Sequence, residues 1–100
     1  MPPQWWRNGD HMKAVVTVIG KDSVGIIAAV SGECAKFGGN ILDISQSVMR
    51  EYFAMIMLIE IENIAVPFSE FAEHLKKLGE ERGLEIHAMH EDIFNSMHRI

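Results

Sequence analysis

The chain has 100 residues, 48% hydrophobic and 23% charged, and this balance predicts one globular domain with a single core. Its formal net charge of −5 argues against a nucleic-acid partner, which would require clustered Lys and Arg. The single cysteine excludes a disulfide framework, and no apolar run approaches the ~18 residues of a membrane span. We therefore expect a cytoplasmic protein that needs no cofactor and binds neither nucleic acid nor membrane.

Residues 1–11 (MPPQWWRNGDH) differ from the rest of the chain, because they hold both tryptophans and show no periodicity. A His-Met pair at His11 and Met12, directly before a clean strand, is typical of an expression-cloning junction. We interpret residues 1–11 as a remnant of such a junction and residues 12–100 as a single domain with a tail at 92–100. The alternative is a natural arm that packs its tryptophans on a partner.

The first predicted elements are a strand, a loop and a helix. Residues 14–19 are rich in β-branched side chains and predict a buried strand, which Gly20-Lys21-Asp22-Ser23 ends. The pair Asp22 and Ser23 is suited to cap the helix, whose free N–H groups and dipole favour a small anion such as a carboxylate. The apolar stripe of this helix is Ile26, Ile27, Val30, Cys34 and Phe37.

A hairpin, a second helix and a last strand follow. Gly38-Gly39 supplies a helix C-cap. Residues 40–49 alternate and predict a half-buried strand, which a polar turn at Arg50-Glu51 joins to an antiparallel strand over residues 52–61. The buried face of the former strand is Leu42, Ile44 and Val48. The second helix, which Gly83 ends, has a stripe of Phe68, Phe71, Leu75 and Leu78. The last strand, residues 84–90, has Leu84, Ile86 and Ala88 on one face.

The predicted order β-α-β-β-α-β is the ferredoxin-like arrangement of the α+β class. It implies a four-stranded antiparallel sheet with two helices on one face and with the first and third strands in the centre. The spacing of Ile93, Met97 and Ile100 predicts a short C-terminal helix, packed on the domain or on a partner.

The third strand is apolar on both faces, although a sheet covered on one side should alternate. Phe53, Met55, Met57 and Ile59 fill one face, and Ala54, Ile56 and Leu58 fill the other. Something must cover the second face. The C-terminal segment or a second protomer would serve, and a homodimer or higher homo-oligomer is the simplest explanation.

Catalytic, metal-binding and RNA-binding roles have little support in the sequence. Cys34 falls in an apolar stripe and is better explained as a buried structural thiol than as a nucleophile. His87 and His90 are three apart on a strand and so face opposite sides, which makes them poor ligands for one metal. A divalent site of His90 and His98 with Glu91 and Asp92 is less favoured than surface histidines. The aromatic pattern of RNA-recognition domains is absent, because Tyr52 and Phe53 are adjacent.

Two segments carry a family resemblance: Gly20-Lys21-Asp22-Ser23-Val24-Gly25-Ile26-Ile27 and Gly39-Asn40-Ile41-Leu42-Asp43-Ile44. They resemble the ACT-domain family, which often shows Asp-x-Pro-Gly-hydrophobic at the first loop and Gly-x-Asn-Ile at the second strand. Val24 departs from this pattern, because proline is common there. The resemblance covers Met12 to His90. With the closing residues 90–100, the chain is similar to small stand-alone ACT proteins and to the ACT modules of the glycine-cleavage-system repressor.

The resemblance implies a regulatory small-molecule module that acts as a homodimer and is not an enzyme. In the family, ligands, commonly amino acids, bind between ACT domains, between the first loop and the start of the second strand. Carried over to this chain, a carboxylate would meet backbone N–H groups, Asn40 would bond the ligand through its amide, and Lys21 would add charge. The implied set is Lys21, Asp22, Ser23, Val24, Gly25, Ile26 and Asn40, with backbone from Ile41 and Leu42 of the neighbouring protomer.

Alternatives stay open. Gly25 and Asn40 would also fit purely local roles, in close helix–strand packing for Gly25 and in a left-handed turn for Asn40. The whole chain would also fit a structural dimerisation module without a ligand. A small enzyme is disfavoured, because no nucleophile–base pair is visible. A regulatory module would act through ligand-linked association with an unknown partner protein.

Overall fold

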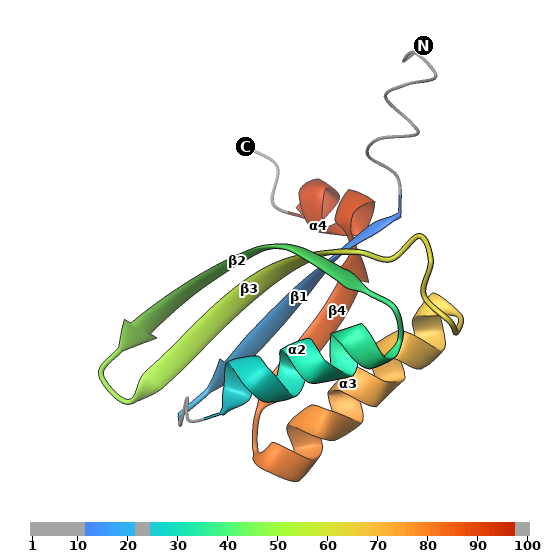
Figure 1. Ribbon diagram of the computed structural model, residues 1–100. Coiled ribbons are helices and arrows are strands. Elements are labelled where there is room, and N and C mark those ends of the chain that lie inside the picture. The colour runs from blue at the N-terminus through green and yellow to red at the C-terminus, as the bar shows by residue number, and fades with distance from the viewer. Residues whose placement is uncertain (1–11, 22–24, 98–100) are drawn as a thin grey trace.

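The computed structural model describes residues 12–21 and 25–97. The predicted junction remnant at residues 1–11, the predicted capping pair Asp22 and Ser23, and the end of the tail at residues 98–100 lie outside the described residues. The elements, in chain order (Figure 1), are β1 (Lys13–Gly20), α2 (Ile26–Lys36), β2 (Asn40–Met49), β3 (Tyr52–Glu60), α3 (Phe68–Arg82), β4 (Glu85–His90) and α4 (Glu91–Met97).

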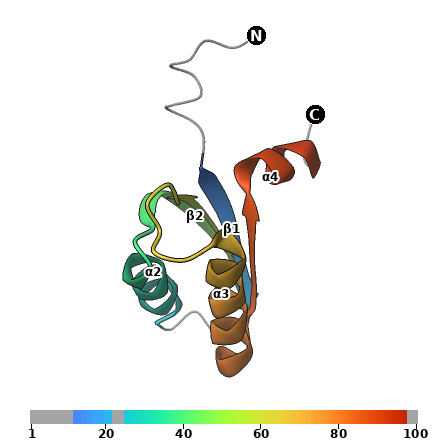
Figure 2. The same ribbon diagram turned by 90° about the vertical axis from the view of Figure 1, so that its right-hand side faces the viewer.

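The four strands form one antiparallel sheet in the order β2-β3-β1-β4, so the predicted ferredoxin-like topology with β1 and β3 in the centre is confirmed. Figure 2 shows α2 and α3 on one side of the sheet and α4 on the other. We call the side under α2 and α3 the core face and the opposite side the open face. The C-terminal helix is thus present, and it contacts β1 and β4.

The core lies between the core face and the two long helices. Val16 and Val18 of β1 meet Met55 and Met57 of β3 on this face, and all four are at most 1% exposed. The helices contribute the stripes that their sequences predict. These are Ile26, Val30 and Cys34 of α2, and Phe71 and Leu75 of α3. Ile27 is the exception, because its side chain is 37% exposed.

Strand β2 differs from its prediction. It was expected to be half-buried, but every residue from Leu42 to Met49 is exposed. A β-bulge between Ile41 and Asp43 removes Leu42 from the alternation, while Ile44 and Val48 still share the core face with Met57 and Phe53 of β3. The reason is position: β2 is an edge strand, and its hairpin with β3 extends beyond the helical layer (Figure 1).

Among the described residues, α4 covers one end of the open face. Val15, on this face, is 5% exposed where α4 lies over β1 and β4, whereas Ile19 and Ile56 are 50% and 47% exposed. The C-terminal segment therefore covers part of the second apolar face, and the part toward the end of β1 is bare in one protomer. Within residues 12–21 and 25–97, no helix is long and apolar enough to cross a membrane.

Candidate functional site

The connection from β1 to α2 starts the predicted ligand site. Helix α2 begins at Ile26 with Gly25 as its N-cap, and none of the described residues caps it with a side chain. The predicted cap by Asp22 and Ser23 lies outside the described residues. Gly25 has φ +73°, a left-handed conformation that glycine adopts without strain and that turns the chain into the helix. No atom of residues 12–21 or 25–97 approaches within 4 Å of a Cβ built at Gly25, so close helix–strand packing does not explain this glycine.

The second half of the predicted site lies where α2 passes into β2. The amide of Gly38 donates to the carbonyl of Ala35 (3.0 Å) and that of Gly39 to the carbonyl of Cys34 (2.8 Å), so the predicted C-cap is confirmed. Gly38 has φ +89°, and Asn40 is an ordinary, exposed strand residue. The left-handed turn proposed for Asn40 is thus wrong, because Gly38 makes it. Ile41 packs against the core, and Leu42 is 44% exposed at the bulge.

These two halves lie at opposite ends of the sheet. Asn40 pairs with Glu60, which pairs with Lys13 at the start of β1, whereas Lys21 follows Gly20 at its end. From Lys13 to Gly20 the strand advances by seven residues, or roughly 23 Å. Lys21, Gly25 and Ile26 are therefore close in sequence and at one end, and Asn40, Ile41 and Leu42 are at the other. One protomer does not bring them together.

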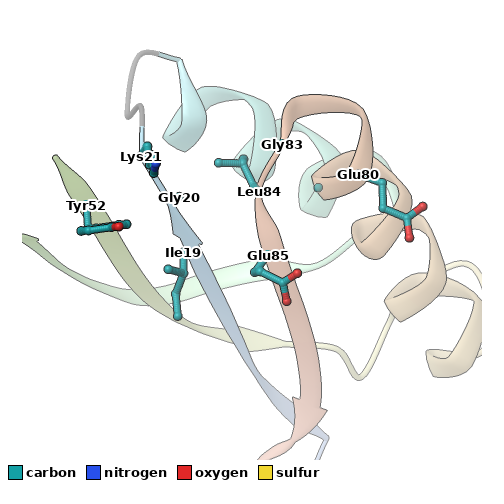
Figure 3. Close-up of a pocket in the computed structure, with 9 residues that line it drawn as sticks. Ile19, Gly20, Lys21, Tyr52, Glu80, Gly83, Leu84 and Glu85 are labelled. Atoms are coloured by element: carbon teal, nitrogen blue, oxygen red, sulfur yellow. The ribbon is translucent and has the colours of Figure 1, made fainter.

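A pocket of about 440 Å³ lies at the Lys21 end. Its walls are the end of β1, the start of β3 and the turn from α3 into β4 (Figure 3). Of its lining residues, the sequence prediction included Lys21 but missed Ile19, Tyr52, Leu84 and Glu85. A signal for them existed: the ferredoxin-like order places the starts of the third and fourth strands beside the end of the first.

The pocket combines one cation with an apolar wall. The Lys21 Nζ lies 5.8 Å from the centroid of the Tyr52 ring, within range of a cation–π contact. Figure 3 shows Leu84 pointing toward Gly20 and Lys21, and Glu80 pointing away from them. The Glu85 Oε1 lies 3.1 Å from the His87 Nε2, so this carboxylate has a hydrogen-bonding partner of its own.

The remaining reactive side chains do not form a catalytic or metal centre in the described part of the chain. Cys34 is fully buried, and burial, helped by the nearby charge of Glu33, raises the pKa of its thiol to about 12. His87 is on the open face, opposite Thr17 of β1. His90 is on the core face, where its ring lies 4.2 Å from that of Phe68 (centroid to centroid). Their predicted opposite orientation is therefore confirmed. No three His, Cys, Asp or Glu side chains are grouped for a metal among residues 12–21 and 25–97.

Comparison with known proteins agrees with this fold. The family model of the ACT domain matches residues 13–89. A UPF0237 protein of Methanocaldococcus jannaschii is 50% identical over 88 residues, which are 88% of this chain and 98% of that protein. An ACT domain protein from Streptococcus pneumoniae superposes with a TM-score of 0.74 at 38% identity, over 84% of this chain and 94% of that one.

A more distant structure carries the second predicted resemblance. A protein described as a glycine cleavage system transcriptional repressor has a TM-score of 0.66 at 25% identity, over 78% of this chain and 44% of its own. The resemblance read from the two loop segments is therefore confirmed by sequence and by structure. The chain belongs to the ACT-domain family.

Proposed function

We propose that this ACT domain is a regulatory module whose ligand, an amino acid, binds between two copies of the chain in the cytoplasm. Occupancy would change the affinity of the module for a partner protein that it modulates. Membership of the family supports the coarser part of this proposal, since ACT domains are generally regulatory and ligand-binding. The finer part depends on the geometry of this chain.

The observation that carries the proposal is the separation of the two halves of the predicted site. Lys21 and Asn40 lie at opposite ends of the sheet in one protomer. Strand β2 is a sheet edge of ten residues, exposed along nearly its whole length. An edge of this length offers a row of unpaired backbone N–H and C=O groups to another strand.

Antiparallel pairing of β2 with its copy brings the two halves toward each other. In a pairing along the whole strand, Asn40 faces Met49 of the partner subunit. Met49 pairs with Tyr52, and the end of β1 follows on the far side of β3. Three strand spacings, ~14 Å, then separate Asn40 from the strand that leads into Lys21 of the partner subunit.

The residue roles follow from this arrangement. Backbone N–H groups of residues 22–26 and the ammonium of Lys21 would bind the carboxylate of the ligand. From the other copy, the amide of Asn40 would bond the ammonium or carboxylate group, beside the backbone of Ile41 and Leu42. A ligand that prefers one assembly state would couple to partner association by ~1–3 kcal/mol.

A thermal-shift screen with the twenty amino acids tests the proposal. A ligand present at 100 times its dissociation constant stabilises the folded state by about 2.7 kcal/mol, which raises the melting temperature measurably. We expect one amino acid to do so, and Asn40→Ala to remove the shift. Asn95→Ala is the matched control, because Asn95 is an exposed asparagine on α4.

The second candidate is a structural dimerisation module without a ligand, which the long edge of β2 equally favours. The same screen separates the two. No response to any amino acid at millimolar concentration would contradict the sensor and support the dimerisation module. If the rise in melting temperature survives in Asn40→Ala, the chain binds a ligand, but the proposed site between the two copies is contradicted.

A further inference from the structure

We infer that the pocket beside Lys21 is a binding site complete within one protomer, and that it takes a small monocarboxylate with a branched apolar body. The carboxylate would pair with the Lys21 ammonium, and the body would lie on Ile19 and Leu84. The inference rests on the proposed function for the presence of a carboxylate ligand. It differs in requiring neither Asn40 nor a second copy.

The size and composition of the pocket support a small ligand. Its volume of about 440 Å³ lies in the range of roughly 300–1,000 Å³ that small-molecule sites occupy. Such sites are mostly apolar with a few polar groups that fix orientation. Here Ile19 and Leu84 are the apolar part, and Lys21 and the Tyr52 hydroxyl are the polar groups on one side.

The charges favour an anion near Lys21. Two carboxylates lie at the pocket. Glu80 points away from Lys21 (Figure 3), and Glu85 forms a hydrogen bond with His87. The Tyr52 ring centroid lies 5.8 Å from the Lys21 ammonium, within range of a cation–π contact. An ammonium positioned in this way makes a charge-assisted bond with a carboxylate, a stronger contact than one between neutral groups.

Two glycines leave room for Leu84, which forms part of the apolar wall. A Cβ at Gly20 would overlap Leu84 Cδ2, and a Cβ at Gly79 would lie 2.7 Å from the carbonyl oxygen of Leu84. Leu84 is therefore fixed between β1 and α3, and it is 8% exposed. Ile19, across the opening, is 50% exposed, an uncommon exposure for an isoleucine in a central strand. A branched body between the two would remove Ile19 from water.

Three probes test the site by amide chemical-shift titration of the full chain. They are isovalerate, its uncharged analogue isovaleramide, and L-valine, which differs from isovalerate by an ammonium group alone. We expect isovalerate or L-valine to shift the amides of Gly20, Lys21 and Leu84, and isovaleramide to bind at least tenfold more weakly. Tighter binding of L-valine would assign the site to amino acids, and tighter binding of isovalerate to acids without the amino group; both support it.

A matched pair of variants locates the binding. Ile19→Glu adds a carboxylate inside the pocket and should weaken binding at least tenfold. Ile56→Glu makes the same change at an equally exposed isoleucine on the same face, outside the pocket, and should leave it unchanged. The inference is overturned when neither carboxylate shifts these amides, or when Ile19→Glu and Ile56→Glu behave alike. Asn40→Ala should leave these chemical-shift changes intact, so a thermal shift that does not depend on Asn40 refutes the proposed function alone.

Discussion

Two helical glycines in this chain have opposite surroundings. A Cβ at Gly79 in α3 would lie 2.7 Å from the Leu84 oxygen and 3.0 Å from Ile86 Cγ1, whereas a Cβ at Gly32 in α2 would meet no atom of the described part of the chain within 4 Å. Gly79 therefore lets α3 approach β4, and Gly32 costs helix stability without a packing role. We predict that Gly79→Ala lowers the free energy of unfolding by about 1–3 kcal/mol, through overpacking.

Gly32→Ala is the control for this prediction. It should raise the free energy of unfolding by about 0.5–1 kcal/mol, because alanine has the higher helix propensity. Urea denaturation of both variants measures the difference. Equal effects of the two substitutions would show that α3 does not approach β4 as closely as described.

The thiol of Cys34 gives a second prediction for a single residue. Burial, and then the charge of Glu33, raises its pKa from 9.0 to about 12 in the folded chain. The unfolded chain releases this proton near pH 9 and the folded chain keeps it, so stability falls as the pH rises between about 9 and 12. We expect a disulfide reagent at pH 8 to leave the native thiol unmodified and to label it fully in urea. Rapid labelling of the native protein would contradict the burial.

At the scale of elements, the sequence predicted what local patterns determine. The stripe of α3 and its end at Gly83, with φ +72°, follow from helical spacing and from the backbone freedom of glycine. The exposure of β2 did not follow, because alternation shows which side chains share a face and not whether a helix covers that face. The bulge at Leu42 was also missed, because Leu42, Ile44 and Val48 fit an unbroken alternation, whereas the extra residue puts Ile41 and Ile44 on one face.

The hairpin between β2 and β3 holds a strained residue. Arg50, in the turn, has φ +57°, a left-handed conformation that costs a non-glycine residue about 1 kcal/mol. We predict that Arg50→Gly raises the free energy of unfolding by up to about 1 kcal/mol. Glu51→Gly, its neighbour, should lower it by about 0.4–1 kcal/mol, because it frees the unfolded chain without relieving strain. Thermal melts of both variants would test the contrast, and stabilisation by Glu51→Gly would contradict it.

At the scale of the whole molecule, the candidate site was predictable only in part. The sequence motifs identified Lys21 and Asn40, but the strand register shows that they are far apart in one protomer. Tyr52 and Leu84 reach the Lys21 end through pairing of strands distant in sequence, and no local motif encodes such pairing. The same limit applies to the second apolar face, where α4 covers Val15 and leaves Ile56 exposed.

The last prediction concerns assembly along β2. Ser45 is an exposed residue near the middle of this edge, so Ser45→Lys places two lysines close together when β2 pairs with its copy. Like charges opposite each other destabilise strand pairs, and lysine on an edge opposes strand addition. We predict a dimer for the parent chain and a monomer for Ser45→Lys by light scattering. Ala28→Lys, which adds the same charge on the exposed side of α2, should stay dimeric.

Melting temperature provides an independent measure of the same equilibrium. Association stabilises the folded chain by mass action, so the melting temperature of a dimer rises with protein concentration. For a domain of this size the rise should be a few degrees for each tenfold increase in concentration. Ser45→Lys should abolish the dependence, and Ala28→Lys should retain it. A concentration-independent melting temperature in the parent chain would exclude assembly through β2, and with it the route by which Asn40 reaches a second protomer.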